Sequence, residues 1–560
     1  MGTKSGSRTV AIGIQDFGKI REMNYFYVDK TDFIREWWSG GDDVTLITRP
    51  RRFGKTLNIS MREHFFSNRY AGQGALFEGL SIWNDEEYRA LQGTYPVISL
   101  SFANVKENTF QKTIERIYQI LTDLYNKHIF LLDSGLLTEE EKRYFLSVNG
   151  RMDETTATIA IHHLSDYMYR YYGKKVIILL DEYDTPMQEA YVNGFWDDLV
   201  AFTRSMFNST FKTNPYMERA MMTGITRVSK ESIFSDLNNL EVVTTTSEKY
   251  ATAFGFTEAE VFAAMDELGL SEKEQVKRWY DGFVFGSVSD IYNPWSIINY
   301  LDKGQFNTYW ANTSANGLVG KLIREGSGEI KETFESLLAG ETITVTLDEQ
   351  IVYNQLNRRE GAIWSLLLAS GYLKVVDADI KEESYELCLT NYEVKRMFDH
   401  MVSGWFDESE GSYNDFIKAL LVGDLDAMNE YMNRVSMSVF SSFDTGNRPS
   451  GAEPERFYHG FVLGLMVDLR SRYVITSNRE SGFGRYDVLL EPKDKADDAF
   501  ILEFKVFNRR REQTLSDTVA AALAQIEEKN YAAVLVEKGV PETKIRKYGF
   551  AFEGKHVLIG

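Results

Sequence analysis

Residues 44–56 read VTLITRPRRFGKT, and this stretch decides the fold of the N-terminal part of the chain. The β-branched run at 44–48 is typical of a short strand. After the turn, Leu57, Met61 and Phe65 recur at the spacing of one helix face. The stretch therefore predicts a strand, a tight loop and a helix in direct succession.

The loop between that strand and helix, RPRRFGKT at 49–56, ends in the residues of a phosphate-binding P-loop. In the pattern G-x-x-x-x-G-K-(S/T), backbone N–H groups cradle phosphates, the lysine contacts them and the hydroxyl binds the metal ion. Gly54, Lys55 and Thr56 supply the end of the pattern, whereas Arg49 replaces its first glycine. The strand and helix around the loop still predict a nucleotide site.

Two further arginines stand in the loop. Arg51 and Arg52 either contact phosphates or only solvate the loop, and we place Arg52 among the expected nucleotide-binding residues. A chance GKT in an ordinary loop is the alternative interpretation of the whole motif.

An acidic strand end follows at 174–184, KKVIILLDEYD. Its continuous apolar run is typical of a central parallel strand with both faces covered. Asp181 at the end of the run is expected to hold Mg²⁺ through water, and Glu182 to orient or deprotonate the attacking water. Thr223 or Arg227, after a later strand, is a candidate γ-phosphate sensor, with an ordinary strand-end loop as the alternative.

Strands alternate with helices up to about residue 240, which predicts a parallel α/β sheet. The expected strands are 44–48, 96–102, a buried strand within 174–184, and 219–226; the expected helices are 57–70, 109–133, 154–172 and 194–211.

The rest of the chain divides by composition. Residues 257–320 resemble small helices with aromatic anchors, 360–400 predict helix, strand, strand, helix in a winged-helix-like order, 412–440 is helical, and 441–455 is the best linker candidate. The last segment predicts helix 455–471, strands 473–476, 485–491 and 499–506, helix 514–529 and strand 531–537.

A second group of chemically active residues lies in this last segment. Asp487 stands in GRYDVLLEP, and Glu503 and Lys505 stand two apart in the apolar run AFILEFKVF, so their side chains share one face of a strand. Two carboxylates and an ammonium converging there predict a divalent-metal site for phosphodiester hydrolysis. Cross-strand charge pairing on a solvated sheet face is the alternative.

Composition limits the class of protein. The chain has 560 residues, a formal charge of −20 and one cysteine, Cys388, so it contains no internal disulfide. Residues 441–560 hold 18 Lys or Arg and 18 Asp or Glu, and the acidic excess lies in residues 71–440. This balance argues against a generic nucleic-acid coat. No apolar run approaches the ~18 residues of a membrane span, and we expect a cytoplasmic protein without a membrane partner.

These stretches resemble a known family, the bacterial proteins that join an AAA-ATPase-like domain to a C-terminal PD-(D/E)xK-superfamily nuclease domain. The resemblance extends over nearly the whole chain. It rests on YFYVDKTDFI (25–34), TRPRRFGKTLN (48–58), VIILLDEYD (176–184), MTGITRVSKESIFSDLNN (222–239), YNPWSI (292–297), FYHGFVLGL (457–465), GRYDVLLEP (484–492), ILEFKV (501–506) and LAQIEEKNYA (523–532).

The resemblance implies an α/β multidomain protein with a P-loop parallel-sheet ATPase domain (1–240), a helical lid (241–330), a winged-helix-like middle (331–440) and a C-terminal restriction-endonuclease-like α/β domain (441–560). It implies ATP and Mg²⁺ or Mn²⁺ as cofactors. It supports the ATP-site and nuclease residues already named, adds Gln525 beside the nuclease site, and makes Thr56, Asp181, Asp487 and Glu503 the expected metal ligands.

The expected function is an ATP-binding and ATP-hydrolysing protein whose ATPase domain regulates a metal-dependent nuclease, with DNA as the expected partner. By analogy alone, its setting would be defence or mobile-element biology. Homo-oligomers and protein partners are compatible with this reading. The alternatives are an NTP-driven switch or scaffold that binds nucleic acid or protein without cleaving, and a nuclease whose ATPase domain is degenerate.

Overall fold

The computed structural model divides the chain into two compact units, residues 1–318 with 342–395, and residues 319–341 with 396–560. The four domains expected from the sequence do not correspond one to one with these two units, and their borders stay a proposal. The structure describes residues 8–226, 233–234, 237–311, 319–320, 322–323, 328–347, 361–379, 384–407, 414–439, 462, 466, 469, 472–477, 480–481, 484–485, 487–508, 511–553 and 556–560.

The first unit is built on a five-stranded sheet whose neighbouring strands are all parallel. Its order is β2 (Val97–Ser101), β3 (Val176–Asp181), β4 (Met217–Gly224), β1 (Val44–Thr48) and β5 (Leu240–Val243). Strands β1 and β3 are buried along their whole length, as the continuous apolar run within 174–184 predicts for β3. The predicted parallel α/β sheet is confirmed, and the C-terminal ends of β1, β3 and β4 meet at one end of it.

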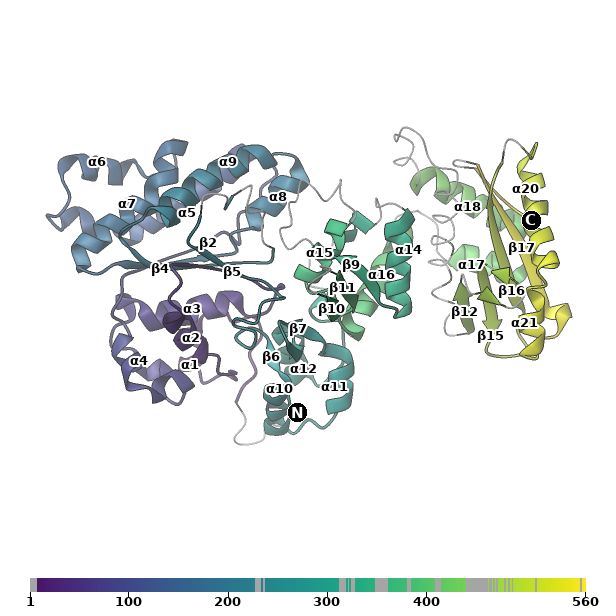
Figure 1. Ribbon diagram of the computed structural model, residues 1–560, viewed down its shortest axis with the longest axis horizontal. Helices are drawn as coiled ribbons and strands as arrows, with labels where there is room; N and C mark the ends of the chain where they lie inside the picture. The colour runs from purple at the N-terminus through teal and green to yellow at the C-terminus, as the bar shows by residue number, and fades with distance from the viewer. Residues whose placement is uncertain are drawn as a thin grey trace. The chain divides into compact units, whose positions relative to one another are not determined.

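Helices cover both faces of this sheet (Figure 1). One layer holds α5 (Phe110–Lys127), α6 (Glu139–Ser147), α7 (Glu154–Tyr172), α8 (Thr185–Asn193) and α9 (Trp196–Phe207); the other holds α1 (Phe17–Glu22), α2 (Asp32–Gly40), α3 (Lys55–Phe66) and α4 (Glu86–Leu91). Helix α5 buries residues 114, 117, 121 and 124, which are the apolar positions that predicted it. Since both faces are covered, polar side chains concentrate where the strands end.

The first unit continues in small elements. These are β6 (Phe256–Thr257), α10 (Glu258–Leu268), α11 (Lys273–Tyr280), β7 (Phe283–Phe285), β8 (Val288–Tyr292) and α12 (Pro294–Lys303). Helices α10, α11 and α12 and strand β8 share one core, which includes Tyr280, Tyr292 and Tyr300. Next come β9 (Ile343–Thr346), α15 (Gly361–Ala369), β10 (Leu373–Asp379), β11 (Ser384–Leu389) and the start of α16 (Tyr392–Asp407), whereas α14 (Gly328–Ala339) belongs to the second unit. Helix α15, the antiparallel pair β10–β11 and α16 follow the helix–strand–strand–helix order that the sequence predicts.

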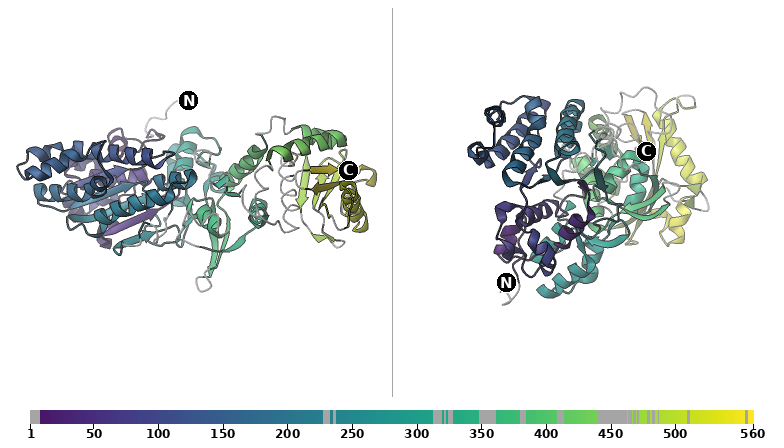
Figure 2. Two further views of the ribbon diagram at one scale, coloured as in Figure 1. Left: turned by 90° about the horizontal axis from the view of Figure 1, so that it is seen from above. Right: turned by 60° about the vertical axis from the view of Figure 1, so that its left-hand side comes forward.

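The second unit holds a mixed sheet of β12 (Tyr473–Ser477), β15 (Val488–Pro492), β16 (Ala499–Val506), β17 (Ile545–Glu553) and β18 (His556–Ile559). The small pair β13 (Glu480–Ser481) and β14 (Gly484–Arg485) forms a separate two-stranded sheet. Only β16 and β17 pair in parallel among the described strands of this sheet. Helices α17 (Asn414–Val422) and α18 (Leu425–Val439) cover one face, and α20 (Leu515–Glu528) and α21 (Ala532–Glu537) the other (Figure 1 and Figure 2).

Helix α18 is tied to the last strand by two asparagine side chains one helical turn apart. Asn429 accepts from the backbone N–H of Ile559 (2.8 Å) and donates to its carbonyl (2.9 Å). Asn433 makes the same pair of bonds with Val557, at 3.0 and 2.7 Å. The two amide side chains thus make the hydrogen bonds to the backbone of β18 that a further neighbouring strand would otherwise make.

One prediction in this unit is wrong. The apolar run at 531–537 is not a strand but mostly helix α21, and the strands that complete the sheet, β17 and β18, lie beyond it. Tyr531, Ala532 and Leu535 are buried at helical spacing, and a short apolar run does not distinguish helix from strand. Most of the predicted helix 455–471 and the linker 441–455 lie outside the described residues.

Candidate functional site

The P-loop leads directly into helix α3, and its backbone conformation suits the binding of an anion. Gly54 caps the helix at φ 81°, a conformation that side chains disfavour. Lys55 is buried, and its Nζ donates to the carbonyls of Arg49 (2.9 Å) and Pro50 (2.8 Å). Burial lowers the pKa of Lys55, while the carboxylates of Glu182, Asp181 and Asp184 raise it. The loop therefore folds around its own lysine.

The hydroxyl of Thr56 and the carboxylate of Asp181 meet at the ends of α3 and β3. Thr56 Oγ1 donates to Asp181 Oδ2 at 2.6 Å, and Thr223 Oγ1, at the end of β4, donates to Asp181 Oδ1 at 2.5 Å. Burial raises the pKa of Asp181, and the two hydroxyl hydrogen bonds oppose that rise. Thr56 and Asp181, expected from the sequence as metal ligands, are thus in direct contact.

Glu182 follows Asp181 with φ 52°, and Arg52 in the P-loop has φ 64°. Positive φ is costly for residues with long side chains and clusters at functional sites. Thr185 Oγ1 donates to Glu182 Oε2 at 3.1 Å. Two strained residues therefore stand at the end of the sheet where Lys55 and Asp181 lie.

Asp184 was not among the expected site residues, although it belongs to the same acidic strand end. Its Oδ2 accepts from the backbone N–H groups of Ile225 and Thr226, both at 2.9 Å, and it is buried. The acidic DEYD run in the sequence could have indicated Asp184. Its hydrogen-bond donors, in contrast, are brought to it by the pairing of β3 with β4. Arg227, the other sensor candidate, lies outside the described residues.

Arg49 lies under the loop. Its side chain is 0% exposed, and Nη1 donates to the carbonyls of Thr48 (2.9 Å) and Thr244 (2.6 Å). Its guanidinium lies 4.5 Å from the centre of the Phe285 ring, and burial lowers the pKa of Arg49 to about 9. The residue that replaces the first P-loop glycine therefore packs between β1 and the β7 strand.

The other two loop arginines contact neighbouring helices. Arg52 places its guanidinium 4.3 Å from the centre of the Trp295 ring on α12. Arg51 Nη2 donates to Gln188 Oε1 on α8 at 2.8 Å. Neither contact decides between the phosphate and solvation readings of these two residues, and the role of Arg52 stays a prediction.

The second group of predicted residues also comes together. Glu503 and Lys505 project from one face of β16 toward α20, where Gln525 Oε1 accepts from Lys505 Nζ at 2.6 Å and Gln525 Nε2 donates to Glu503 Oε1. Glu503 is 2% exposed. Asp487, just before β15, accepts from the backbone N–H of Phe504 at 2.8 Å. This burial and bonding do not fit a solvated sheet face.

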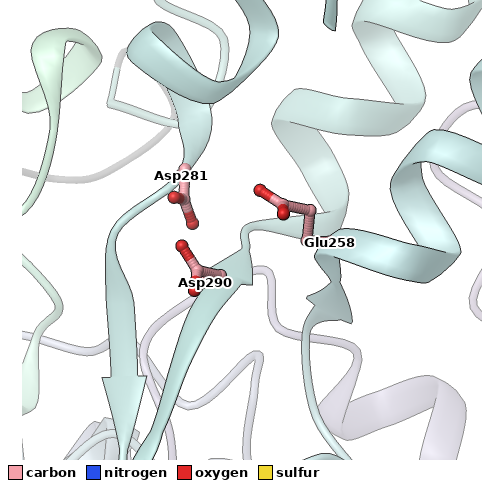
Figure 3. A group of neighbouring side chains, drawn as sticks. All are labelled: Glu258, Asp281 and Asp290. Carbon is pink, nitrogen blue, oxygen red and sulfur yellow. The ribbon is translucent and has the colours of Figure 1, made fainter. Parts of the chain in front are cut away.

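A different carboxylate cluster lies in the small elements of the first unit (Figure 3). Glu258, Asp281 and Asp290 each bring one carboxylate oxygen within 4.8 Å of the others. Lys277 Nζ lies 2.5 Å from Glu258 Oε2 and 3.1 Å from Asp290 Oδ1. Burial, with the neighbouring Asp290, raises the pKa of Asp281 to about 7. An ammonium group already balances this cluster, and it carries no metal assignment here.

Comparison with known proteins gives a family match over each of the two stretches that hold these groups of residues. Residues 11–234 match the family model described as a predicted AAA-ATPase, and residues 453–560 match that of the PD-(D/E)XK nuclease superfamily. A protein of Azotobacter chroococcum mcd 1, described as an uncharacterized protein in the vnfD 5′ region, is 25% identical over 547 residues, with 95% of each chain covered.

Domains of these two kinds suggest ATPase and nuclease activity. In the described part of the chain, no helix combines the length and hydropathy that a membrane crossing needs. The five-stranded parallel sheet and the mixed C-terminal sheet agree with the two matches. Residues 11–234 therefore match an AAA-ATPase-like domain, and residues 453–560 match a domain of the PD-(D/E)XK nuclease superfamily.

Proposed function

We propose that the protein binds and hydrolyses ATP at the P-loop and cleaves DNA at the C-terminal site in a metal-dependent reaction, with the nucleotide state regulating cleavage. The observation that carries the proposal is the network in which Gln525 holds both Lys505 and Glu503 on one strand face. A solvated charge pair needs no amide bridge to a buried carboxylate such as Glu503. The residues at the P-loop support the ATPase part.

At the P-loop, Thr56 and Asp181 would hold a Mg²⁺ ion, and their direct contact in this structure supports that fit. Such an ion, when bound, neutralises charge on the phosphate oxygens. Lys55 would exchange the carbonyls of Arg49 and Pro50 for phosphate oxygens, and the N-terminal N–H groups of α3 would donate to them. Glu182, beside Asp181, would orient the attacking water.

At the C-terminal site, Asp487 and Glu503 would hold the divalent cation. Two carboxylates of which one is buried suit Mg²⁺ or Mn²⁺, and a bound cation supplies Lewis-acid activation there. Lys505 would position water and donate to the phosphoryl oxygens of the scissile group. Gln525 fixes the distance between Lys505 and Glu503, because its oxygen accepts from one while its nitrogen donates to the other.

The test is cleavage of labelled plasmid, linear duplex and single-stranded DNA with Mg²⁺ or Mn²⁺, with and without ATP. Lys505→Ala is the site variant. Lys547→Ala is the matched control, because Lys547 lies on the neighbouring strand β17 and pairs with Glu527 of α20 at 2.7 Å. We expect cleavage to be lost in the first variant and kept in the second.

The ATPase part has its own pair of variants. Lys55→Ala removes the loop ammonium, whereas Lys142→Ala removes a partly exposed lysine that pairs with Glu139 on α6. Only the first should abolish ATP hydrolysis. If wild-type protein cuts no DNA with either metal while its ATPase is intact, the nuclease proposal fails, and a nucleotide-driven switch that binds without cleaving takes its place.

A further inference from the structure

The backbone of the P-loop is held from outside by a tryptophan. Trp310 is buried, and its indole Nε1 donates to the carbonyl of Arg51 at 3.0 Å. Asn293, which caps helix α12, donates to the same carbonyl at 3.4 Å. The rings of Phe283 and Tyr372 flank Trp310, each with its centre 5.5 Å away. The indole is therefore fixed, and its N–H fixes one peptide of the loop.

A buried carboxylate fixes the backbone of this tryptophan in turn. Glu393 Oε1 accepts from the backbone N–H of Trp310 at 2.7 Å and of Ala311 at 3.4 Å. Its Oε2 accepts from Ser296 Oγ of α12 at 2.8 Å. Glu393 is 1% exposed. A buried carboxylate is costly without hydrogen-bond donors, so this arrangement is stable only while its donors keep their positions.

Glu393 stands in the first turn of helix α16. That helix begins in the first compact unit and runs past the division at residues 395 and 396, after which the chain belongs to the second unit. The hydrogen bonds just described therefore connect a P-loop peptide to the start of the helix that continues into the nuclease-bearing unit.

We propose that Trp310 and Glu393 are positioning residues that couple nucleotide occupancy of the P-loop to the order of helix α16. The proposal rests on ATP binding at Lys55 as proposed above. Neither residue is assigned to touch the nucleotide. Trp310 acts on the loop through the Arg51 carbonyl, and Glu393 acts on α16 by anchoring its first turn.

The physical reason lies in the position of the peptide that Trp310 holds. Arg51 directly follows Arg49 and Pro50, whose carbonyls accept from Lys55. When a phosphate takes the ammonium, these carbonyls lose their donor and the loop readjusts. Because the Arg51 carbonyl is bonded to Trp310, the readjustment changes the hydrogen bonds at Trp310 and Glu393. Coupling of this kind is reciprocal. If ATP binding orders α16, weakening the link therefore also weakens ATP binding.

The experiment measures nucleotide affinity and amide hydrogen exchange in the full chain. Trp310→Phe keeps an aromatic ring and removes the indole N–H. Glu393→Ala removes the acceptor, whereas Glu393→Gln keeps an acceptor oxygen and serves as the conservative rescue. Trp38→Phe is the matched control, since Trp38 packs on Phe66 and Tyr95 in the same unit without touching the loop in any contact described here.

We expect Mg²⁺ and a non-hydrolysable ATP analogue to slow exchange of the amides in residues 392–407 of the wild type. In Trp310→Phe and Glu393→Ala, the analogue should bind about five-fold more weakly, as expected for one lost hydrogen bond, and the slowing in α16 should disappear. Glu393→Gln and Trp38→Phe should retain both properties. A purely structural role for Trp310 would lower the melting temperature without removing the response of α16.

The outcomes separate this inference from the function on which it rests. If the wild type binds the analogue but exchange in α16 does not respond, or if Trp310→Phe and Glu393→Ala respond like the wild type, the coupling is refuted while ATP binding stands. If the wild type binds no nucleotide at all, the proposed ATPase function fails first and this inference fails with it. If Trp310→Phe does not fold, the Glu393 pair decides alone.

Discussion

Replacing Arg49 by glycine restores the first residue of the general P-loop pattern, and we predict that it damages the protein. The buried guanidinium contributes hydrogen bonds to the carbonyls of Thr48 and Thr244 and a contact with the ring of Phe285. Glycine would leave both carbonyls without this donor and would open a cavity under the loop.

The size of the effect follows from opposing contributions. Burial lowers the pKa of Arg49 from 12.5 to about 9, which corresponds to a cost of about 5 kcal/mol for keeping the charge inside. Two hydrogen bonds from a charged donor contribute about 3–6 kcal/mol, and the ring contact about 2 kcal/mol. The favourable and unfavourable contributions of the guanidinium to the free energy of unfolding therefore nearly cancel. The side-chain volume that Arg49→Gly removes then determines the effect, which is about 3–5 kcal/mol of destabilisation.

The assay is urea unfolding followed by intrinsic fluorescence, together with a titration of the ATP analogue. Arg49→Met keeps most of the side-chain volume and should change the free energy of unfolding by less than about 2 kcal/mol. Arg49→Gly should be far less stable and bind nucleotide no better than the wild type. If Arg49→Gly were as stable as the wild type and bound ATP more tightly, the packing role derived for this arginine would be refuted.

Three further predictions concern other sites. Lys505→Ala should reduce metal-dependent DNA cleavage by about 100-fold or more and leave ATP hydrolysis unchanged, which parallel assays on one preparation would check. Burial raises the pKa of Glu393 from 4.5 to about 7, so the contribution of Glu393 to the free energy of unfolding is complete below pH 4.5 and is lost as the pH rises through 7. The loss is about 3 kcal/mol. Glu393→Gln should not show it when unfolding is compared at pH 5 and pH 8. Lys277→Ala should lower the melting temperature more at pH 8 than at pH 5. The pKa of Asp281 is raised to about 7, so Asp281 is charged at pH 8 and needs the ammonium of Lys277 most there. An equal drop at pH 5 and pH 8 would contradict the role given to Lys277 in the cluster of Glu258, Asp281 and Asp290.

The helices and strands that the sequence predicted correctly show a hydrophobic periodicity within their own residues. Strand β16 alternates between two cores: Phe500, Leu502 and Phe504 face α17 and α18, while Ala499 and Ile501 face α20 and α21. A period of two is visible in the chain alone. The run at 531–537 has no such alternation, and only the surrounding packing makes it a helix.

The candidate sites divide in the same way. Gly54, Lys55 and Thr56 are adjacent in the sequence, and Glu503 and Lys505 are two apart, so local motifs predicted that they act together. Trp310 and the Arg51 carbonyl are 259 positions apart, and nothing near either residue indicates the other. Such a contact is created by the folded chain, which is why sequence reasoning singled out the loop at 49–56 but not the residues that hold it.

The asparagines of α18 have a consequence for how the C-terminal part can be isolated. Strand β18 ends its sheet, and an exposed edge strand is a template for pairing with another molecule. Asn429 and Asn433 block that edge by occupying the backbone groups of Ile559 and Val557. A fragment that starts at residue 441 would lose this cover and expose the edge of β18 to pairing, whereas one that starts ahead of α17 would keep the edge covered.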